Sequence, residues 1–176
     1  MSIWTDLWNL FFPHSCLLCG RQLISGERVL CLKCLSRLPR TQFHLRKDNI
    51  VECNFWGKIP VEHATSFLYY AKGGNVRQLL YELKYHGNQE VGEVMGRMMA
   101  SELMCSHFFD GIDLIVPVPL HQRKKRLRGY NQSECLARGV SVVTGIPMDT
   151  KVVIRSRYTD TPVSYTHLTL PTSDLV

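Results

Sequence analysis

Apolar residues recur with helical spacing in three stretches of this chain. Residues 76, 79, 80 and 83 are apolar, an i, i+3, i+4, i+7 pattern that predicts an amphipathic helix closed by Gly87. Further helices are predicted over residues 90–104 and from Asn131 to the stop signal at 144–147. Runs of β-prone residues predict strands at 64–70, 112–118 and 151–155. This order of elements predicts an α/β layer with at least partly parallel strands.

Two glycines lie inside the second predicted helix. Gly92 and Gly96 each weaken an isolated helix by about 1 kcal/mol relative to alanine. We therefore expect this helix to pack closely against a neighbour.

The flanking segments have weaker patterns. Residues 3, 4, 7, 8 and 11 are apolar and would share a helical face, which favours an N-terminal docking helix over a membrane-surface or partner contact. Residues 37–60 lack a sustained period and are interpreted as a linker with Trp56 as its anchor. No apolar run approaches the roughly 18 residues of a membrane span, and we expect a cytoplasmic protein.

Four cysteines have the spacing of a metal site. Cys16 and Cys19 form one C-x2-C pair, and Cys31 and Cys34 form another. Two facing pairs would supply the tetrahedral thiolate shell of a structural Zn²⁺ site, and Gly20 suits the tight turn after the first pair. Reduced thiols, disulfides or a redox motif are the weaker alternatives. The three remaining cysteines are expected to be small buried hydrophobes. They are Cys53, Cys105 and Cys135.

A cationic stretch follows the predicted strand at 112–118. Pro117 and Pro119 end the strand, and five cations follow within residues 123–128 before Gly129. Asn131 and Glu134 fit a capping box, so a helix N-terminus would face the same point. The formal net charge of +6 also favours anionic partners.

The cationic stretch has three possible roles. It could be a solvated basic loop, a nucleic-acid contact or a site for a small phosphorylated ligand. The nucleic-acid interpretation has Tyr130 as the one aromatic residue of the loop, whereas a stacking platform needs more. We favour the small ligand, because it alone uses the strand end, the glycine and the helix N-terminus together. Lys84, at a helix end beside a glycine turn, is either a solubilising lysine or a further phosphate contact.

Several motifs in order resemble the ComF family. They are the four-cysteine knuckle, Leu-Lys-Tyr at 83–85, Val-Pro-Val-Pro-Leu at 116–120, Arg-Gly-Tyr-Asn-Gln-Ser at 128–133 and Arg-x-Arg-x-Thr-x-Thr at 155–161. The resemblance implies a type I phosphoribosyltransferase fold behind an N-terminal zinc ribbon. It also implies a role in DNA uptake during competence or in DNA utilisation.

The resemblance further assigns candidate residues and ligands. By position, Arg126, Arg128, Gly129 and Tyr130 would grip a diphosphate, with Lys84 as a further candidate. Arg155, Arg157 and Thr159 would begin a flexible flap over the site. The implied partners are phosphoribosyl pyrophosphate or a similar ligand, single-stranded DNA and the DNA-uptake machinery. Mg²⁺ is compatible with the full-length family fold.

The chain departs from the family pattern after the flap. The family's adjacent acidic residues and Thr-Thr-Gly loop are missing, and residues 162–176 match nothing in the family. We interpret this tail as a frameshift or assembly artefact, and expect a truncated, inactive transferase. The competing hypothesis is a zinc-ribbon nucleic-acid-binding or adaptor protein that uses the fold as a scaffold.

The expected fold class is α/β, an incomplete type I phosphoribosyltransferase-like core preceded by a small four-cysteine zinc-ribbon module. The expected parts are an N-terminal helix and zinc ribbon (1–36), a linker (37–60), a partial phosphoribosyltransferase-like domain (61–161) and an off-pattern tail (162–176).

Overall fold

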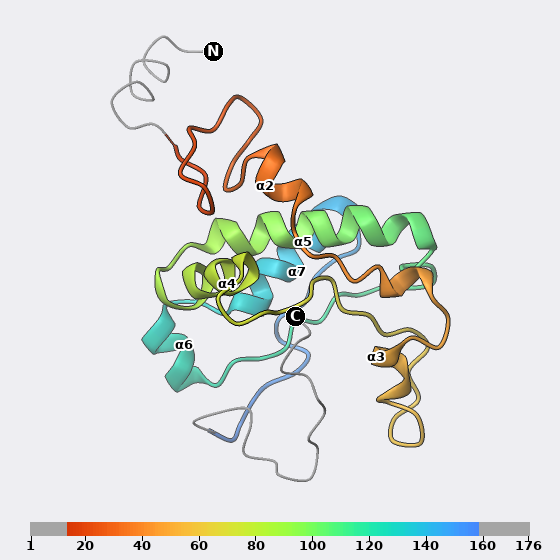
Figure 1. Cartoon of the computed structure of the whole chain (residues 1–176). Coiled ribbons are helices and arrows are strands. Elements are labelled where there is room, and N and C mark those ends of the chain that lie inside the picture. The colour runs from red at the N-terminus through yellow and green to blue at the C-terminus, as the bar shows by residue number, and fades with distance from the viewer. Residues whose placement is uncertain (1–13, 159–176) are drawn as a thin grey trace. The chain divides into compact units, whose positions relative to one another are not determined.

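The chain forms two compact units, Met1–Leu38 and Pro39–Val176. The computed structural model describes residues 14–158 (Figure 1). The predicted N-terminal helix, Thr159 and the off-pattern tail lie outside the described residues. Among the described helices, none has the length and apolar character needed to cross a bilayer.

The first unit is built on two turns that carry the cysteines. An antiparallel bridge joins Ser15 to Gln22, and the Gly20 amide between them donates to the Cys16 carbonyl at 2.8 Å. Gly20 has φ 71°, a left-handed conformation that glycine adopts without steric cost, as the predicted tight turn requires. Cys31 caps the short helix α2 (Leu32–Ser36).

Three longer helices dominate the second unit and confirm the predicted helical stretches. They are α4 (Asn75–Tyr85), α5 (Gln89–Leu103) and α7 (Gln132–Thr144). Gly87 and Gly145 follow α4 and α7 with φ of 71° and 75°, so the predicted glycine stops are also confirmed.

The helices α5 and α7 pack with their backbones almost in contact (Figure 1). A Cβ added at Gly96 would lie 2.1 Å from the Leu136 carbonyl oxygen, and one at Gly139 would lie 2.2 Å from the Glu93 carbonyl oxygen. At Gly92 it would lie 2.7 Å from the Cys135 Cβ. The close packing predicted from Gly92 and Gly96 is therefore confirmed.

Apolar side chains from all three helices form the core of the second unit. The buried residues include Val76, Leu79, Leu83, Val91, Met95, Cys135 and Val140. Cys135 is 1% exposed, as predicted, but Cys53 and Cys105 are exposed and that prediction was wrong. The Cys53 thiol donates to the Asp48 carbonyl, five residues earlier, and the Cys105 thiol donates to the Ser101 carbonyl, four residues earlier.

The predicted segments do not form regular strands, so these predictions were largely wrong. Between residues 14 and 158 pairing is limited to isolated bridges, including an antiparallel one between Arg40 and Leu68 and a parallel one between Ile115 and Met148. Residues 151–155 have no strand assignment. A β-prone run becomes a strand only when a partner strand satisfies its backbone groups, and local sequence does not specify that partner. The α/β core therefore stays a prediction.

The cationic stretch, predicted as a loop, is the helix α6 (Gln122–Arg128). The His121 side chain accepts a hydrogen bond from the Arg123 amide at 3.2 Å, and Gly129 ends the helix with φ 81°. Gln, Arg, Lys and Leu are all good helix formers. The charge of the stretch favoured a loop, but its intrinsic propensity is helical.

The region predicted as a linker contains the short helices η1 (Phe43–Leu45) and α3 (Ile50–Cys53). Asn49 and Glu52 form a capping box at the start of α3, and Glu52 Oε1 also accepts from the Ala64 amide at 3.4 Å. Trp56 is 61% exposed, so its predicted role as an anchor was wrong.

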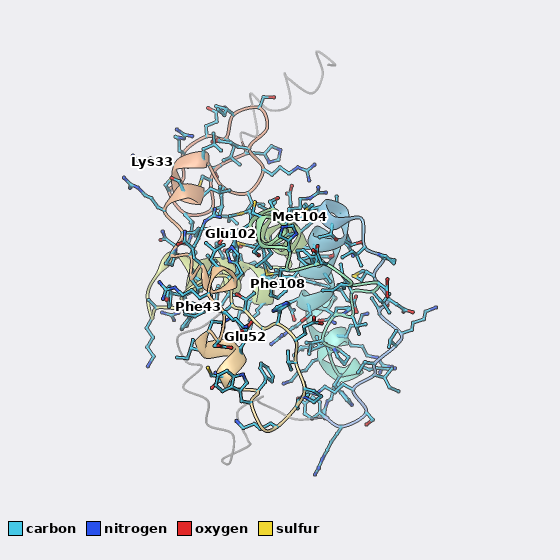
Figure 2. The ribbon with its side chains drawn as sticks, turned by 90° about the vertical axis from the view of Figure 1, so that its right-hand side faces the viewer. Lys33, Phe43, Glu52, Glu102, Met104 and Phe108 are labelled. Carbon is cyan, nitrogen blue, oxygen red and sulfur yellow. The ribbon has the colours of Figure 1, made fainter. Side chains whose placement is uncertain are left out.

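A cluster of polar side chains ties this region to Glu102, near the C-terminal end of α5. Figure 2 labels Glu102. Arg40 donates to Glu102, and the Arg40 guanidinium lies 5.6 Å from the Phe67 ring centroid. The His44 side chain is 5% exposed, with its Nδ1 3.9 Å from the other Glu102 oxygen. The three side chains anchor residues 40–44 on α5.

We predict that Gly96→Ala destabilises the second unit. Alanine favours an isolated helix by about 1 kcal/mol, but the new Cβ would meet the α7 backbone, which has no side-chain rotamer to change. Overpacking of this kind costs about 1–3 kcal/mol, so we expect a net fall in the free energy of unfolding measured in urea. Val142 on α7 is 53% exposed, so Val142→Ala is the control and should change the free energy of unfolding little. A Gly96→Ala protein as stable as the parent would contradict the packing.

Candidate functional site

The first unit brings the four predicted metal ligands together. The thiol sulfurs of Cys16, Cys19, Cys31 and Cys34 all lie within 4.8 Å of one another. Cys16 and Cys31 are 2% and 0% exposed, whereas Cys19 is exposed. Converging thiols of this kind are typical of a closed four-coordinate metal site.

Backbone amides surround these thiols. The Cys31 amide donates to Cys16 Sγ at 3.3 Å, and the Cys34 amide donates to Cys31 Sγ at 3.4 Å. Burial raises the pKa of the Cys16 thiol, but amides of Cys31, Cys19 and Leu18 outweigh it and hold this pKa to about 6. Hydrogen bonding to Cys19, followed by burial, raises the pKa of Cys34 to about 12. The cluster thus already stabilises a thiolate at Cys16.

Glu27 is a structural residue of this unit that the sequence analysis missed. Its side chain is 4% exposed, and its carboxylate accepts from the Leu32 amide at 2.7 Å and the Ile24 amide at 3.1 Å. These hydrogen bonds, that from Leu32 first, lower the pKa of Glu27. Because Leu32 is the first residue of α2, the carboxylate holds the helix start next to Cys31.

The described residues fit a metal ion at the four cysteines and nowhere else among residues 14–158. They do not fit an Mg²⁺ ion held by the protein, because Mg²⁺ prefers oxygen ligands and no cluster of carboxylates is found in that range. Four thiolates fill all four positions of a tetrahedral metal ion, so no position is left for a substrate. This is the chemistry of a structural site.

The second unit has a cavity of about 840 Å³ on one side of α6. Four cations and one carboxylate line it. They are Arg123, Lys125, Arg126, Arg155 and Glu134. Pro117, Pro119 and Leu120 form another wall, so the cavity lies where the predicted strand 112–118 ends. Two residues predicted for different roles, Arg126 for the diphosphate and Arg155 for the flap, thus line the same cavity.

Asn131 fixes the start of α7 at the edge of this cavity. Its Oδ1 accepts from the Ser133 amide at 3.1 Å, and its Nδ2 donates to the Val118 carbonyl at 3.0 Å. The predicted cap at Asn131 is therefore confirmed, but the predicted capping box is not, because Glu134 contacts the Asn131 side chain rather than its backbone amide. Glu134 contacts the Asn131 side-chain amide at 3.4 Å and binds Lys125 Nζ at 3.0 Å, which offsets its negative charge. The net character of the cavity is cationic.

A second cavity, of about 540 Å³, also borders α6. Lys84, Arg128 and Lys124 line it, together with Tyr85, His86, Gly87, Leu127 and Tyr158. Arg126 and Arg128 line different cavities, so the predicted diphosphate group is divided between them.

The other predicted residues occupy different positions. Tyr130 is 7% exposed and its hydroxyl donates to the Leu83 carbonyl, while burial raises its pKa. Gly129 serves as the C-cap of α6. Arg157 is exposed and lines neither cavity, and Thr159 lies outside the described residues.

Aromatic residues beside α6 were missed in the sequence. Tyr158 lies 5.2 Å from both the His121 ring and the Arg123 guanidinium, and Tyr85 lies 5.9 Å from the Arg128 guanidinium. They come from segments far from α6 in the chain and have no local spacing relation to it. The sequence does show a tyrosine in two of the ComF-like motifs: Tyr85 ends Leu-Lys-Tyr, and Tyr158 directly follows Arg157.

The chain is similar to curated proteins of enteric bacteria. It is 28% identical over 149 residues to the DNA utilization protein YhgH of Escherichia coli K12, which covers 83% of this chain and 62% of that protein. The YhgH protein of Shigella flexneri gives the same values. That of Salmonella typhi is 30% identical over 86 residues, which is 47% of this chain and 38% of that protein.

No protein-family model matches the chain, and no solved structure matches it either. The chain spans 62% of the length of the E. coli relative, less than two thirds. The similarity therefore relates most of this chain to part of proteins that are named for DNA utilization.

Proposed function

We propose that the chain is a ComF-type, phosphoribosyltransferase-like protein of DNA utilisation that acts in the cytoplasm. In this proposal the 840 Å³ cavity beside α6 binds phosphoribosyl pyrophosphate or a similar phosphorylated ligand. The likeness to proteins named for DNA utilization supports the biological setting. The type I phosphoribosyltransferase fold belongs to the proposal as well.

The main support for the proposal is that Arg126 and Arg155 line the same cavity. They come from α6 and from a segment almost 30 residues later, yet both face the end of the proline-rich segment 117–120. The start of α7 lies at the same edge through Asn131, whose side chain accepts from the Ser133 amide. Arginine side chains that converge on one point are a recurrent arrangement for phosphate groups.

The chemistry of the cavity suits a diphosphate leaving group. Displacement at an anomeric carbon develops negative charge on the departing diphosphate, and fixed cations stabilise that charge. Arg126 and Arg155 would hold the phosphate oxygens, while the pairing of Lys125 with Glu134 keeps the carboxylate from repelling them. This arrangement supports binding of the phosphorylated ligand. Residues elsewhere would select the substrate that accepts the phosphoribosyl group.

Zn²⁺ is proposed as the metal of the four-cysteine cluster, with a structural role. Four thiolates select soft or borderline metals and leave no position open for a reactant. Binding of structural Zn²⁺ contributes about 10–16 kcal/mol to the folding of small zinc modules. The first unit has a small buried core, including Val29 and Leu30 beside the cysteines, and would depend on that contribution.

Purified protein is expected to contain about one zinc per chain by mass-spectrometric elemental analysis. Cys31→Ser should lose this zinc, because Cys31 is fully buried between the other thiols and also caps α2. Cys105→Ser removes an exposed thiol outside the cluster and should retain the metal. Equal zinc in both variants, or a different metal in the parent, would refute the assignment.

Calorimetric titration with pyrophosphate and with phosphoribosyl pyrophosphate tests the cavity. Arg126→Ala should weaken binding by about 10- to 100-fold, since a hydrogen bond to a charged group contributes about 1.5–3 kcal/mol. Arg138→Ala removes the same charge from an exposed position of α7 away from the cavity and should bind like the parent. Absence of saturable binding by the parent, or equal loss in both variants, would overturn the proposal.

A further inference from the structure

Among the described residues that line the 840 Å³ cavity, Glu134 is the one acidic side chain. It comes from the first turn of α7, and its side chain is 21% exposed, so a ligand in the cavity can reach the carboxylate. A carboxylate repels phosphate groups. A bare diphosphate therefore gains nothing from this residue, whereas a ligand that carries hydrogen-bond donors does.

The contacts of Glu134 leave part of its acceptor capacity open. Lys125 Nζ lies 3.0 Å from Oε1 and 3.3 Å from Oε2, and the Asn131 side-chain amide donates to Oε1 at 3.4 Å. Each carboxylate oxygen has two lone pairs, so these contacts occupy both on Oε1 and one on Oε2. Within residues 14–158, Oε2 thus keeps an acceptor position for a hydroxyl group.

The same partners hold the carboxylate in place. The Asn131 amide that contacts Glu134 also donates to the Val118 carbonyl at 3.0 Å, which ties Glu134 to the proline-rich wall of the cavity. Lys125 ties it to α6. Because Glu134 is already ordered, a ligand hydroxyl can bind it with little further loss of side-chain entropy.

We propose that Glu134 is a specificity-determining residue, which makes the 840 Å³ cavity select phosphorylated sugars over bare phosphates. Oε2 accepts from a sugar hydroxyl, while Arg126 and Arg155 hold the phosphate oxygens. A hydroxyl that donates to a carboxylate forms a charge-assisted hydrogen bond, which is stronger than one to a neutral acceptor. This inference rests on the proposed function, since it needs a phosphorylated ligand in this cavity.

A purely structural role of Glu134 has a different consequence. If Glu134 only held Lys125 and the start of α7, its loss would weaken the binding of every phosphorylated ligand alike. A carboxylate that accepts from the ligand instead changes the ratio of affinities between ligands with and without hydroxyl groups. The ratio is therefore the quantity to measure.

The test is calorimetric titration with ribose 5-phosphate and tetrahydrofurfuryl phosphate, which has the same ring and phosphate but lacks the hydroxyls. The parent should prefer ribose 5-phosphate at least about tenfold, as expected for a hydrogen bond to a charged group. Glu134→Gln should lose most of this preference. It should bind pyrophosphate at least as tightly as the parent, because the repulsion is removed.

Matched variants separate the carboxylate from its surroundings. Glu90→Gln removes the same charge from an exposed position of α5 outside the cavity and should keep the parent's preference. Lys125→Gln should weaken the binding of both phosphorylated ligands and of pyrophosphate, yet keep the preference, because the contact of Glu134 with Asn131 stays. Circular dichroism checks the helix content of each variant.

The outcomes distinguish this inference from the proposed function. A parent that binds pyrophosphate without preferring ribose 5-phosphate, or a Glu134→Gln variant that keeps the preference, would overturn the role of Glu134 alone. A parent that binds none of the three ligands would overturn the phosphate site as well.

Discussion

The close contact of α5 with α7 is the constraint on which the second unit depends. Gly92, Gly96 and Gly139 remove the side chains that would otherwise hold the two helix backbones apart. Cys135 then fills the space beside Gly92 and is itself 1% exposed. Dispersion and apolar burial grow with such close approach, and they offset the helix-propensity cost of the glycines, about 1 kcal/mol each.

This contact also positions the residues around α6. Because α7 is fixed against α5, its first turn is fixed as well, and Asn131 there binds the Val118 carbonyl. Tyr130, just before the cap, donates to the Leu83 carbonyl near the end of α4. The two hydrogen bonds hold the proline-rich segment and α4 on either side of one short cationic helix. Packing in the helical core thus determines where the cations of α6 can act.

Much of this arrangement was predictable from local sequence. The apolar period of α4 and α7, the glycines of α5 and the cap at Asn131 depend on residues within a few positions, and all were confirmed. The C-x2-C pairs likewise predicted the cysteine cluster, since the ligand spacing is itself the geometric requirement.

The failures involve non-local partners or competing local signals. Residues 64–70 and 112–118 have strand propensity, but each makes an isolated bridge to a segment some 28 to 33 residues away that no local pattern indicates. The high charge of residues 122–128 suggested a loop, whereas their helix propensity was the signal that the structure follows. Cys53 and Cys105 lie near the exposed apolar residues Ile50 and Met104, and a lone cysteine gives no local signal that separates such positions from that of buried Cys135.

Helical geometry gives α6 its particular electrostatic role. A loop with five cations could direct them all to one ligand, as the sequence suggested, whereas a helix turns successive side chains by about 100° and distributes them around its axis. Arg123, Lys125 and Arg126 therefore line one cavity, and Lys124 and Arg128 the other. Like charges on one helix repel less when they are divided in this way, and Glu134 compensates Lys125 on one side. The same division places Lys124 5.6 Å from the Tyr158 ring centroid and Arg128 5.9 Å from the Tyr85 ring centroid. The secondary structure of these seven residues thus decides which cations share a cavity.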